Sequence, residues 1–589
     1  MMKKHLTQID PQIWILLAFS IFAWGPLLTP AYFFNAHDAR HSIFYLVEFD
    51  QTLRDGFLWP RWSPDFAFGY GYPLFNIYAP LAIYMAEVVH LPGAPMIAAV
   101  KTIYILSTIG AGLAMYGFTR RLFGAKAGLL AGMVYMFAPF HLLEIYVRSA
   151  YAEYVSLMWL PLVLWAFTEL IARPNFKRLA LAGAAYGLLA LTHHATFFTF
   201  TPFLMLYIAV GHLSLVICHL PFVARRSSFV ACGSLRNWFK GMLFSVGAGL
   251  LGLALASIYL LPAILEQRFI KVEQWTSGSY NFAQHFVYFS QFLSPFWGYE
   301  YAGAGVNDGM SYQLGIVVYG LLAFALVGLL RCHREMARKG MAIIFFGATL
   351  LAVWLMSPLA EGVWMALPIA SLVQFPWRLL IIAMLSASVA AGSLAASLRP
   401  DDTVLGITVL IVALGSYAYA QPQYTDIPDW ADTPLAIINW DSASIQDRVG
   451  MVVYTDEQPV SSPMEAQYRA GEQLGTAAII AGDASVEMLH HGGASDKVRV
   501  IGGPATLQFY TYDYPGWRVT LDGQPIPHRR EPPYGLITVD VPPGDHTLQL
   551  RMGSTPARVI GGGLSLLALG IIGTGVFGRR RSGRRSKAD

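Results

Sequence analysis

The chain has 589 residues, of which 55% are hydrophobic and only 13% are charged. Soluble domains carry about 25% charged residues, and the mean hydropathy of this chain is +0.47. These values exclude a disordered chain and a wholly soluble protein, and they predict a polytopic membrane protein. The formal net charge is only +4 and the basic residues are scattered along the chain, which argues against nucleic-acid binding.

Twelve apolar segments approach or reach the length of about 20 residues that a membrane-spanning helix requires. The third and the fifth are the shortest. The segments lie at 13–33, 96–118, 127–142, 152–172, 179–194, 196–219, 241–264, 313–330, 341–357, 378–398, 403–420 and 559–578.

Lysine and arginine are distributed unevenly between the two sides of these spans. If the N-terminus is inside, the short inner loops hold most of the basic residues, and the tail after the last span adds six more. Because basic residues favour the cytoplasmic side, we expect both termini of this multi-pass protein to be cytoplasmic.

Most of the polar sequence falls outside, in segments near 34–95, 265–312 and 421–557. The first shows helical periodicity at 44–56, with a charged and an apolar face, which is typical of helices lying in the membrane interface. The third contains short alternating runs at 498–501, 507–512, 517–521, 536–541 and 546–552, separated by turn signals, which predicts an all-β sandwich. We therefore expect a helical membrane domain at 1–420, an outer β-sandwich domain at 421–557, and a last span with a basic cytoplasmic tail at 558–589.

Asp38 lies just past the first span, in N-A-H-D-A-R-H (35–41). A carboxylate there can act as a general base toward a hydroxyl group or hold a divalent metal. His37 and His41 bracket it and are candidate co-ligands, although without a third spaced partner the two histidines fit a polar lining role better. The structural alternative for Asp38 is a helix N-cap, and on sequence alone the two roles are equally favoured.

Further ionisable residues lie at the outer ends of later spans. Glu144, Arg148 and Glu153 fall between the third and fourth spans, where ionisable groups are functional candidates. The structural alternative is a local Glu144–Arg148 ion pair. For Glu153 a functional role is favoured, because it lies at the start of an apolar helix. His193 and His194, in T-H-H-A-T, either donate hydrogen bonds to a phosphate or sugar or contact lipid headgroups.

Arg378, in Q-F-P-W-R before the tenth span, places a positive charge on the expected outer side of the membrane, where lysine and arginine are disfavoured. An anionic partner such as a phosphate would satisfy its planar guanidinium group. The alternatives are snorkelling to lipid phosphates and pairing with Glu361. Arg268 belongs to a charged group after the seventh span that either binds a headgroup or is simply solvated.

The order of these motifs resembles that in GT-C-type integral-membrane glycosyltransferases. An acidic segment and interfacial helices follow the first span, and in this chain the aromatic run F-G-Y-G-Y-P-L-F (68–75) comes next. With R-S-A-Y-A-E-Y (148–154), L-T-H-H (191–194) and Q-F-P-W-R (374–378), the chain more narrowly resembles bacterial membrane proteins labelled "6-pyruvoyl-tetrahydropterin synthase-related". The segment from Y-P-G-W-R-V-T-L to H-T-L-Q-L-R-M resembles the C-terminal outer domain of YfhO-like membrane proteins.

The resemblance implies a bacterial plasma-membrane enzyme that takes a sugar from a polyprenyl-phosphate carrier and passes it to a glycan, lipid or protein acceptor on the outer face. Asp38 matches the acidic position after the first span, and Arg378, with Arg148 and Arg268, would hold the carrier phosphate. Several members carry two acidic residues where this chain has His37 and Asp38. No cofactor is implied with certainty, and a divalent metal at His37, Asp38 and His41 is the one candidate.

The outer domain offers Tyr512, Tyr514 and Trp517 as a stacking surface for a glycan, or as the aromatic core of a small sandwich, which is favoured for Trp517. Two other functions stay open. One is a transporter or flippase for lipid-linked glycans, although no internal repeat is evident and the charges gather at the outer boundary. The other is a non-catalytic assembly factor that binds glycans through its outer domain.

Overall fold

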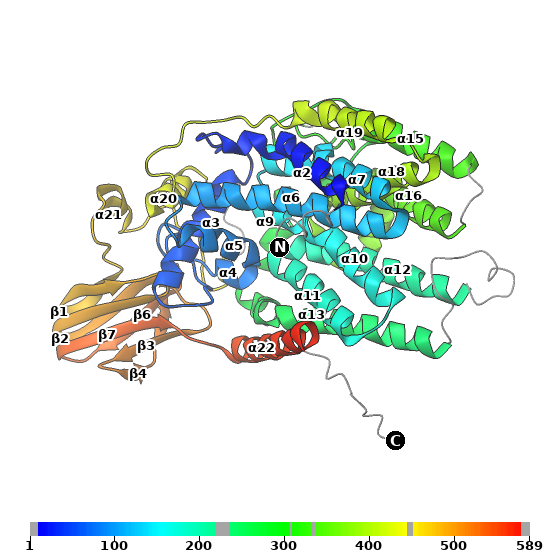
Figure 1. Ribbon diagram of the computed structural model, residues 1–589. Coiled ribbons are helices and arrows are strands. Elements are labelled where there is room, and N and C mark those ends of the chain that lie inside the picture. The colour runs from blue at the N-terminus through cyan, green and yellow to red at the C-terminus, as the bar shows by residue number, and fades with distance from the viewer. Residues whose placement is uncertain (1–9, 218–234, 307–308, 332–335, 445–450, 579–589) are drawn as a thin grey trace, which may run out of the picture.

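The computed structural model describes residues 10–217, 235–306, 309–331, 336–444 and 451–578. It consists of a large helical part with a β-sheet region at one end (Figure 1). All twelve segments expected to span the membrane contain helices. The basic tail after residue 578 lies outside the described residues.

Within the described residues, nine helical segments are long and apolar enough to cross a membrane. A tenth candidate is the pair α7 (Ala125–Phe137) and α8 (Pro139–Tyr146), which is bent by 40°. Two more expected spans are the shorter helices α11 (Phe176–Thr192) and α15 (Ile316–Arg331). The nine segments are built on α2 (Pro11–Trp24), α6 (Met96–Phe123), α9 (Tyr151–Ser156) with α10 (Trp159–Ala172), α12 (His194–Ile217), α13 (Leu235–Leu265), α16 (Met336–Met356), α18 (Leu380–Leu398), α19 (Asp402–Ser416) and α22 (Pro556–Phe577).

Helix α18 lies at the centre of the helical part, with 89% of its apolar window buried. It is rich in alanine, glycine and serine, and such small residues let neighbouring helices approach closely. A Cβ atom on Gly392 would lie 2.7 Å from the backbone oxygen of Ala127 on α7. This close contact fixes α18 and therefore also the residues that precede it, including Arg378.

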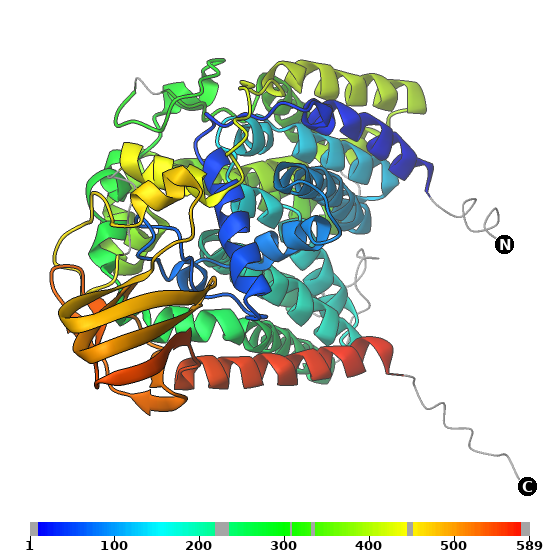
Figure 2. The ribbon, with the colours of Figure 1, turned by 90° about the vertical axis from the view of Figure 1, so that its left-hand side faces the viewer.

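Ion pairs join helix ends that lie away from the sheet. Arg120 at the end of α6 is 3.4 Å from Asp10 before α2, and Lys126 is 2.8 Å from Asp402 at the start of α19. Figure 2 shows α2 beginning, and α22 ending, on the side opposite the sheet. The helical part therefore has two distinct ends, one beside the sheet and one away from it.

The segment after α2 folds into α3 (Ala39–Arg54), α4 (Leu74–Ile77) and α5 (Leu81–His90). Helix α3 was expected at 44–56 as an amphipathic helix in the membrane interface. It begins earlier, and most of its residues are buried, including Glu48 and Asp50. The reason is that α5 and the outer helix α20 (Pro434–Ala443) both contact it.

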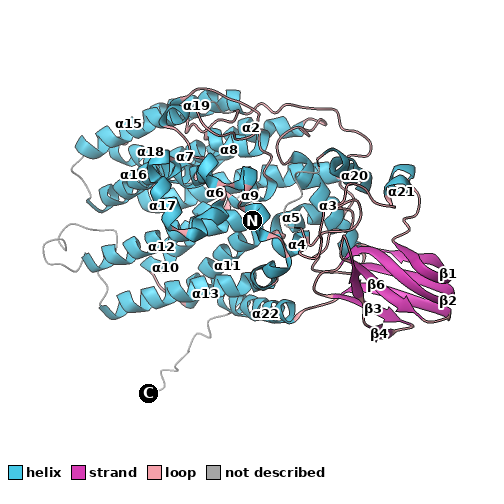
Figure 3. Ribbon diagram, turned by 180° about the vertical axis from the view of Figure 1, so that it is seen from behind, coloured by secondary structure: helices cyan, strands magenta, loops and turns pink. Residues whose placement is uncertain are grey.

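The chain between α19 and α22 holds α20, α21 (Glu465–Ala470) and a seven-stranded antiparallel sheet, which Figure 3 shows gathered at one end of the helices. The order is β4-β3-β7-β2-β6-β5, with β1 also paired to β2. The strands are β1 (Ala477–His491), β2 (Ser495–Tyr512), β3 (Trp517–Leu521), β4 (Gln524–Ile526), β5 (Arg529–Glu531), β6 (Leu536–Val541) and β7 (Gly544–Met552).

The sheet corrects the expected sandwich, because hydrogen bonds join all seven strands into one sheet rather than two. The first half of β2 pairs with β7 and its second half pairs with β6. The change of partner falls at 502–505, where the pairing with β1 is also irregular. Both halves contribute to a single hydrophobic core, so a bend in one long strand replaces a second sheet.

Candidate functional site

Asp38 occupies the N-cap position of α3, but its side chain makes no capping hydrogen bond. The backbone around it is held from elsewhere. The Asp38 N–H donates to the carbonyl of Arg148 at 2.7 Å, and the His37 N–H donates to the carbonyl of Val147 at 3.1 Å. The carboxylate is half-buried. The capping alternative is therefore not the role of this side chain, which stays available for another partner.

Arg148 lies between two buried carboxylates. Its guanidinium pairs with Glu144 and, at 3.0 Å, with Glu153. Glu144 is 0% exposed, Glu153 3% and Arg148 6%. The guanidinium also lies 4.6 Å from the ring centroid of Trp377. The expected local Glu144–Arg148 pair is thus present, but as part of a larger group in which two carboxyl groups flank the one guanidinium of Arg148.

Arg378 lies in the short 3-10 helix η8 (Pro376–Leu379) that leads into α18. Its Nη1 donates to the carbonyl of Val373 at 2.7 Å and to Gln374 Oε1 at 2.8 Å. Its Nε has no hydrogen-bond partner among the described residues. Glu361, the alternative partner, is exposed, and among those same residues no ion pair joins it to Arg378.

Asp38 and Arg378 lie within electrostatic range of each other. Arg378 interacts electrostatically with Glu153, Arg148, Glu144 and Asp38. Positive backbone φ angles occur beside both arginines, 50° at Ser149 and 65° at Gln374. Such φ values are uncommon outside glycine and persist only where surrounding contacts hold them. We call Asp38, Glu144, Arg148, Glu153 and Arg378 the ionic cluster.

His193 and His194 border the ionic cluster. The His193 ring is buried, with its Nδ1 2.8 Å from the hydroxyl of Thr196. His194 opens α12 and its side chain is exposed. Both histidines are close enough to Glu153 and Arg378 to interact electrostatically. Each can therefore contribute a ring nitrogen to a polar group that enters the cluster.

Two neighbours of the cluster were not among the residues singled out from the sequence. Tyr78 interacts electrostatically with Asp38 and Glu153, and its ring lies 6.3 Å from that of His194. Trp377 covers Arg148. Tyr78 had no sequence signal beyond the aromatic content of its loop, whereas Trp377 stands next to Arg378 in the quoted Q-F-P-W-R motif.

The expected metal site at His37, Asp38 and His41 is not assembled. His37 Nε2 donates to the carbonyl of Tyr299 at 3.2 Å, and its ring stacks on Tyr301 at 4.3 Å. The His41 ring instead faces Trp440 at 5.4 Å. In the part of the chain that the structure describes, no group of three His, Cys, Asp or Glu residues could hold a metal. Burial and the charge of Arg148 lower the pKa of His37, which favours the neutral ring.

Three further residues do not lie where their expected binding roles require. Arg268 is exposed and lies 4.9 Å from the ring of Phe269, so it is not one of the arginines of the ionic cluster. Tyr512 is 0% and Tyr514 is 1% exposed, which leaves neither ring free to stack on a glycan. The side chains of both tyrosines point into the hydrophobic core of the sheet, where they pack together with Trp517.

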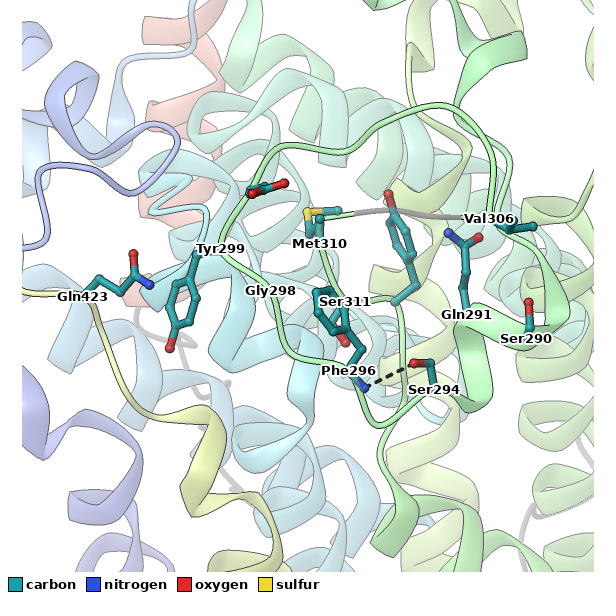
Figure 4. A pocket seen from close by; sticks show the side chains of 13 residues that line it. Ser290, Gln291, Ser294, Phe296, Gly298, Tyr299, Val306, Met310, Ser311 and Gln423 are labelled. Atoms are coloured by element: carbon teal, nitrogen blue, oxygen red, sulfur yellow. Dashed lines mark hydrogen bonds between the residues drawn. The ribbon is translucent and has the colours of Figure 1, made fainter.

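A cavity of about 900 Å³ is lined by described residues of the segments 290–306 and 309–312 and by Gln423 after α19 (Figure 4). Two of its lining residues also contact neighbours of the cluster: Tyr299 binds His37, and the ring of Tyr312 lies 6.5 Å from that of Trp377. The cavity is lined by Ser290, Gln291, Ser294, Phe296, Gly298, Tyr299, Glu300, Val306, Gly309, Met310, Ser311, Tyr312 and Gln423.

No family model matches the chain. An uncharacterised protein of Lactococcus lactis subsp. cremoris is 22% identical over 187 residues, which is 30% of each chain. The oligosaccharyltransferase of Archaeoglobus fulgidus, solved with a tethered acceptor peptide, is 13% identical with a TM-score of 0.45 over 77% of this chain. Arabinofuranosyltransferase AftD from Mycobacteria is 14% identical with a TM-score of 0.43 over 73% of this chain. The match spans 60% of the first solved chain and 28% of the second.

Proposed function

We propose that the protein is a membrane glycosyltransferase that moves a sugar from a polyprenyl-phosphate donor to an acceptor on the outer face of the membrane. The observation that carries the proposal is the link through Arg148, whose carbonyl accepts the Asp38 N–H and whose guanidinium lies over Trp377, the residue next to Arg378. Asp38 and Arg378 each keep unused capacity, since Asp38 makes no capping bond and Arg378 Nε has no partner among the described residues. This arrangement supplies a base and an anion-binding group within one ionic cluster.

Asp38 acts as the general base. Its carboxylate takes the proton of an acceptor hydroxyl as that oxygen attacks the anomeric carbon of the donor sugar. The new bond joins the acceptor oxygen to the anomeric carbon, and the bond from that carbon to the carrier phosphate oxygen breaks. A positioned base of this kind contributes about 10²–10⁴-fold to the rate.

Arg378 holds the leaving phosphate. Its guanidinium is planar and carries several donors, which suits paired hydrogen bonds to phosphate oxygens. Arg148 is less available for this role because Glu144 and Glu153 already oppose its charge. Arg148 instead fixes the two carboxylates, and His193 and His194 add ring nitrogens near the same phosphate.

The location of the cluster suits a lipid-linked donor. Asp38 lies just beyond the first candidate span and Arg378 begins another, so a carrier whose chain stays in the bilayer can present its phosphate there. A nucleotide sugar from the cytoplasm would meet the opposite end of these helices. The proposed donor is therefore a polyprenyl-phosphate sugar.

The test is transfer by the purified protein from radiolabelled polyprenyl-phosphate sugars to a panel of acceptors, with Asp38→Asn alongside. We expect transfer to fall by about 10²-fold or more in Asp38→Asn. The melting temperature should be unchanged, because no capping bond is lost. Asp10→Asn is the matched control, since Asp10 caps α2 at the other end of the molecule and should leave transfer intact.

The rival functions give different outcomes. Movement of labelled lipid between leaflets, without transfer to any acceptor, would identify a flippase. Full transfer by Asp38→Asn would remove Asp38 from the mechanism.

A further inference from the structure

We propose that the segment joining α16 to α18 does not leave the membrane but lies among the lipid chains of the leaflet on the side of the sheet. The segment consists of η6 (Pro358–Ala360), α17 (Glu361–Ala366) and η7 (Pro368–Val373). Figure 3 shows α17 among the helices and away from the sheet. The inference goes beyond the proposed function, because it does not depend on what the protein transfers.

The joining segment keeps large apolar side chains on its surface. Of the six residues of α17, only Trp364 is buried. Glu361 is the only charged residue between Lys339 and Arg378. The exposed side chains are Leu359 at 70%, Val363 at 39%, Met365 at 66%, Leu367 at 51% and Leu372 at 43%. An apolar helix as short as α17, held by one buried side chain, is not stable in water on its own, so this surface needs an apolar partner.

A neighbouring segment has the same character. The N–H of Val287 donates to the carbonyl of Met356 at 2.8 Å, and the ring of Phe282 stacks on Trp364 at 5.5 Å. Residues 282–296 contain no aspartate, glutamate, lysine or arginine. Their exposed side chains include Tyr288 at 38%, Phe289 at 53% and Leu293 at 72%. Two adjoining segments therefore present apolar surface at the same end of α16.

The length of α16 distinguishes lipid from other partners. Its apolar window, Lys339–Met356, has 18 residues, which rise about 27 Å. The hydrocarbon core is about 30 Å thick, and a tilted helix covers less of it. The chain therefore reaches Ser357 while it is still inside the core. Leu350 and Trp354 on α16 are exposed to the membrane, and Leu359 continues this apolar surface beyond the helix end.

The backbone of the segment also suits a lipid environment, where no water satisfies free N–H and C=O groups. The three short helices follow one another almost without a break. The Leu367 N–H donates to the carbonyl of Trp364 at 3.2 Å, and the Ala370 N–H donates to that of Leu367 at 2.8 Å. The indole N–H of Trp364 donates to the carbonyl of Leu355 at 2.8 Å. Much of the polar backbone is thus paired within the segment.

Insertion of the segment has a consequence for Arg378. The guanidinium of Arg378 donates to the carbonyl of Val373, the last residue of η7, at 2.7 Å. The depth of η7 in the bilayer therefore sets the depth of this charge. An arginine directly beyond the lipid chains lies at the level of the polar headgroups.

The experiment measures how lipid and water reach single positions of the full-length protein in vesicles of phosphatidylethanolamine and phosphatidylglycerol. The three native cysteines are replaced by serine, and a nitroxide is attached to Leu359→Cys or Met365→Cys. Its collision rates with oxygen, which concentrates in lipid, and with a nickel chelate, which stays in water, are compared. The matched controls are Leu350→Cys on α16 and Ile480→Cys on β1, at aliphatic positions that are 60% and 46% exposed.

The oxygen-to-nickel ratio at Leu359 and Met365 should be close to that at Leu350 and several-fold above that at Ile480. A ratio as low as that at Ile480 would place the segment in water and overturn the inference. Low collision rates with both reagents would mean that protein covers the labels, a second copy if dipolar coupling appears between them, and would overturn it as well. If either variant lowers the melting temperature, Leu367→Cys, at another exposed position, takes its place with the same expected ratio.

Discussion

Arg148 and Arg378 differ in how much of their charge the protein itself uses. Arg148 is paired with two buried carboxylates, whereas Arg378 bonds only neutral oxygens, at Val373 and Gln374. The first arginine therefore supports the local structure, and the second remains available for a ligand. The two sites should respond differently to the same substitution.

Arg148→Gln should destabilise the protein strongly, because Glu144 and Glu153 would be left buried without a cation. Removing one partner of a buried ion pair costs about 3–5 kcal/mol. Arg378→Gln should lower the melting temperature much less while reducing transfer. The measurement is thermal unfolding in detergent, and Arg148→Gln combined with Glu144→Gln should recover part of the loss. Equal melting temperatures for Arg148→Gln and the unmodified protein would show that the carboxylates have other partners.

At the scale of single residues, the sequence revealed polar groups but not their surroundings. Charged residues stand out in an apolar chain, so Asp38, Arg148 and Arg378 could be found by inspection. Arg268 has the same kind of local sequence signal, and only the tertiary fold separates it from the cluster. Tyr512 and Tyr514 could not be assigned to a core or a surface either, because an aromatic ring serves equally well in both places.

Helix α3 illustrates what sequence periodicity leaves undetermined about an element. Its charged face predicted contact with water or headgroups, yet Glu48 and Asp50 are buried against other outer elements. Those elements come from distant parts of the chain, α20 among them. Periodicity gives the presence of the helix and approximately its length, and tertiary contacts decide what its polar face meets.

The contact between α3 and α5 should make stability depend on pH. Glu87 on α5 is 1% exposed, and its carboxylate oxygens have no hydrogen-bond partner among the described residues. Burial and the nearby charge of Asp50 raise the pKa of Glu87 from 4.5 to about 7. The folded state thus holds this proton more tightly than the unfolded state. The free energy of unfolding should therefore fall as the pH rises from about 4.5 to 7, by at most about 1.4 kcal/mol per pH unit.

Glu87→Gln should remove this pH dependence, since the amide stays neutral throughout. Melting temperatures measured between pH 5 and 8 (about the window set by the two pKa values) should fall less steeply in the variant, with its advantage greatest at the alkaline end. Glu273→Gln, at an exposed carboxylate, is the control and should keep the original slope. Parallel curves for Glu87→Gln and the unmodified protein would exclude Glu87 as the titrating group.

At the scale of the whole molecule, the division into a helical part and an outer β region follows from composition, because apolar spans and alternating strands have different periods. The shape of the sheet does not follow. The runs at 498–501 and 507–512 look like two strands in the sequence but form one bent strand, β2. Strand β1 was not expected, since its residues show no regular alternation. Pairing between distant segments, rather than local pattern, determines the number of sheets.

The helical part and the sheet are joined by a second buried ionic group, around Glu266 at the end of α13. Arg558 of α22 lies 2.9 Å from Glu266, which also accepts hydrogen bonds from Thr555 and, at 2.9 Å, from Asn76. Asn76 in turn donates to the Tyr514 hydroxyl at 2.9 Å. This group links the first outer loop, α13, the sheet and α22. Unlike the ionic cluster, it has its principal polar atoms paired within the protein, which identifies it as a structural connection.

Glu266→Ala should loosen the attachment of the sheet, because Arg558 would be left buried without its counter-ion, at a cost of about 3–5 kcal/mol. Hydrogen exchange should become faster in β3 and the first turns of α22, and remain unchanged in α18. Arg499→Ala is the control: Arg499 and Asp545 form an exposed pair at 2.5 Å, and exposed pairs contribute little to stability because water screens them. If the two variants exchange alike, the sheet is held by its apolar contacts with Trp62 and Phe269, and the Glu266 group only orients it.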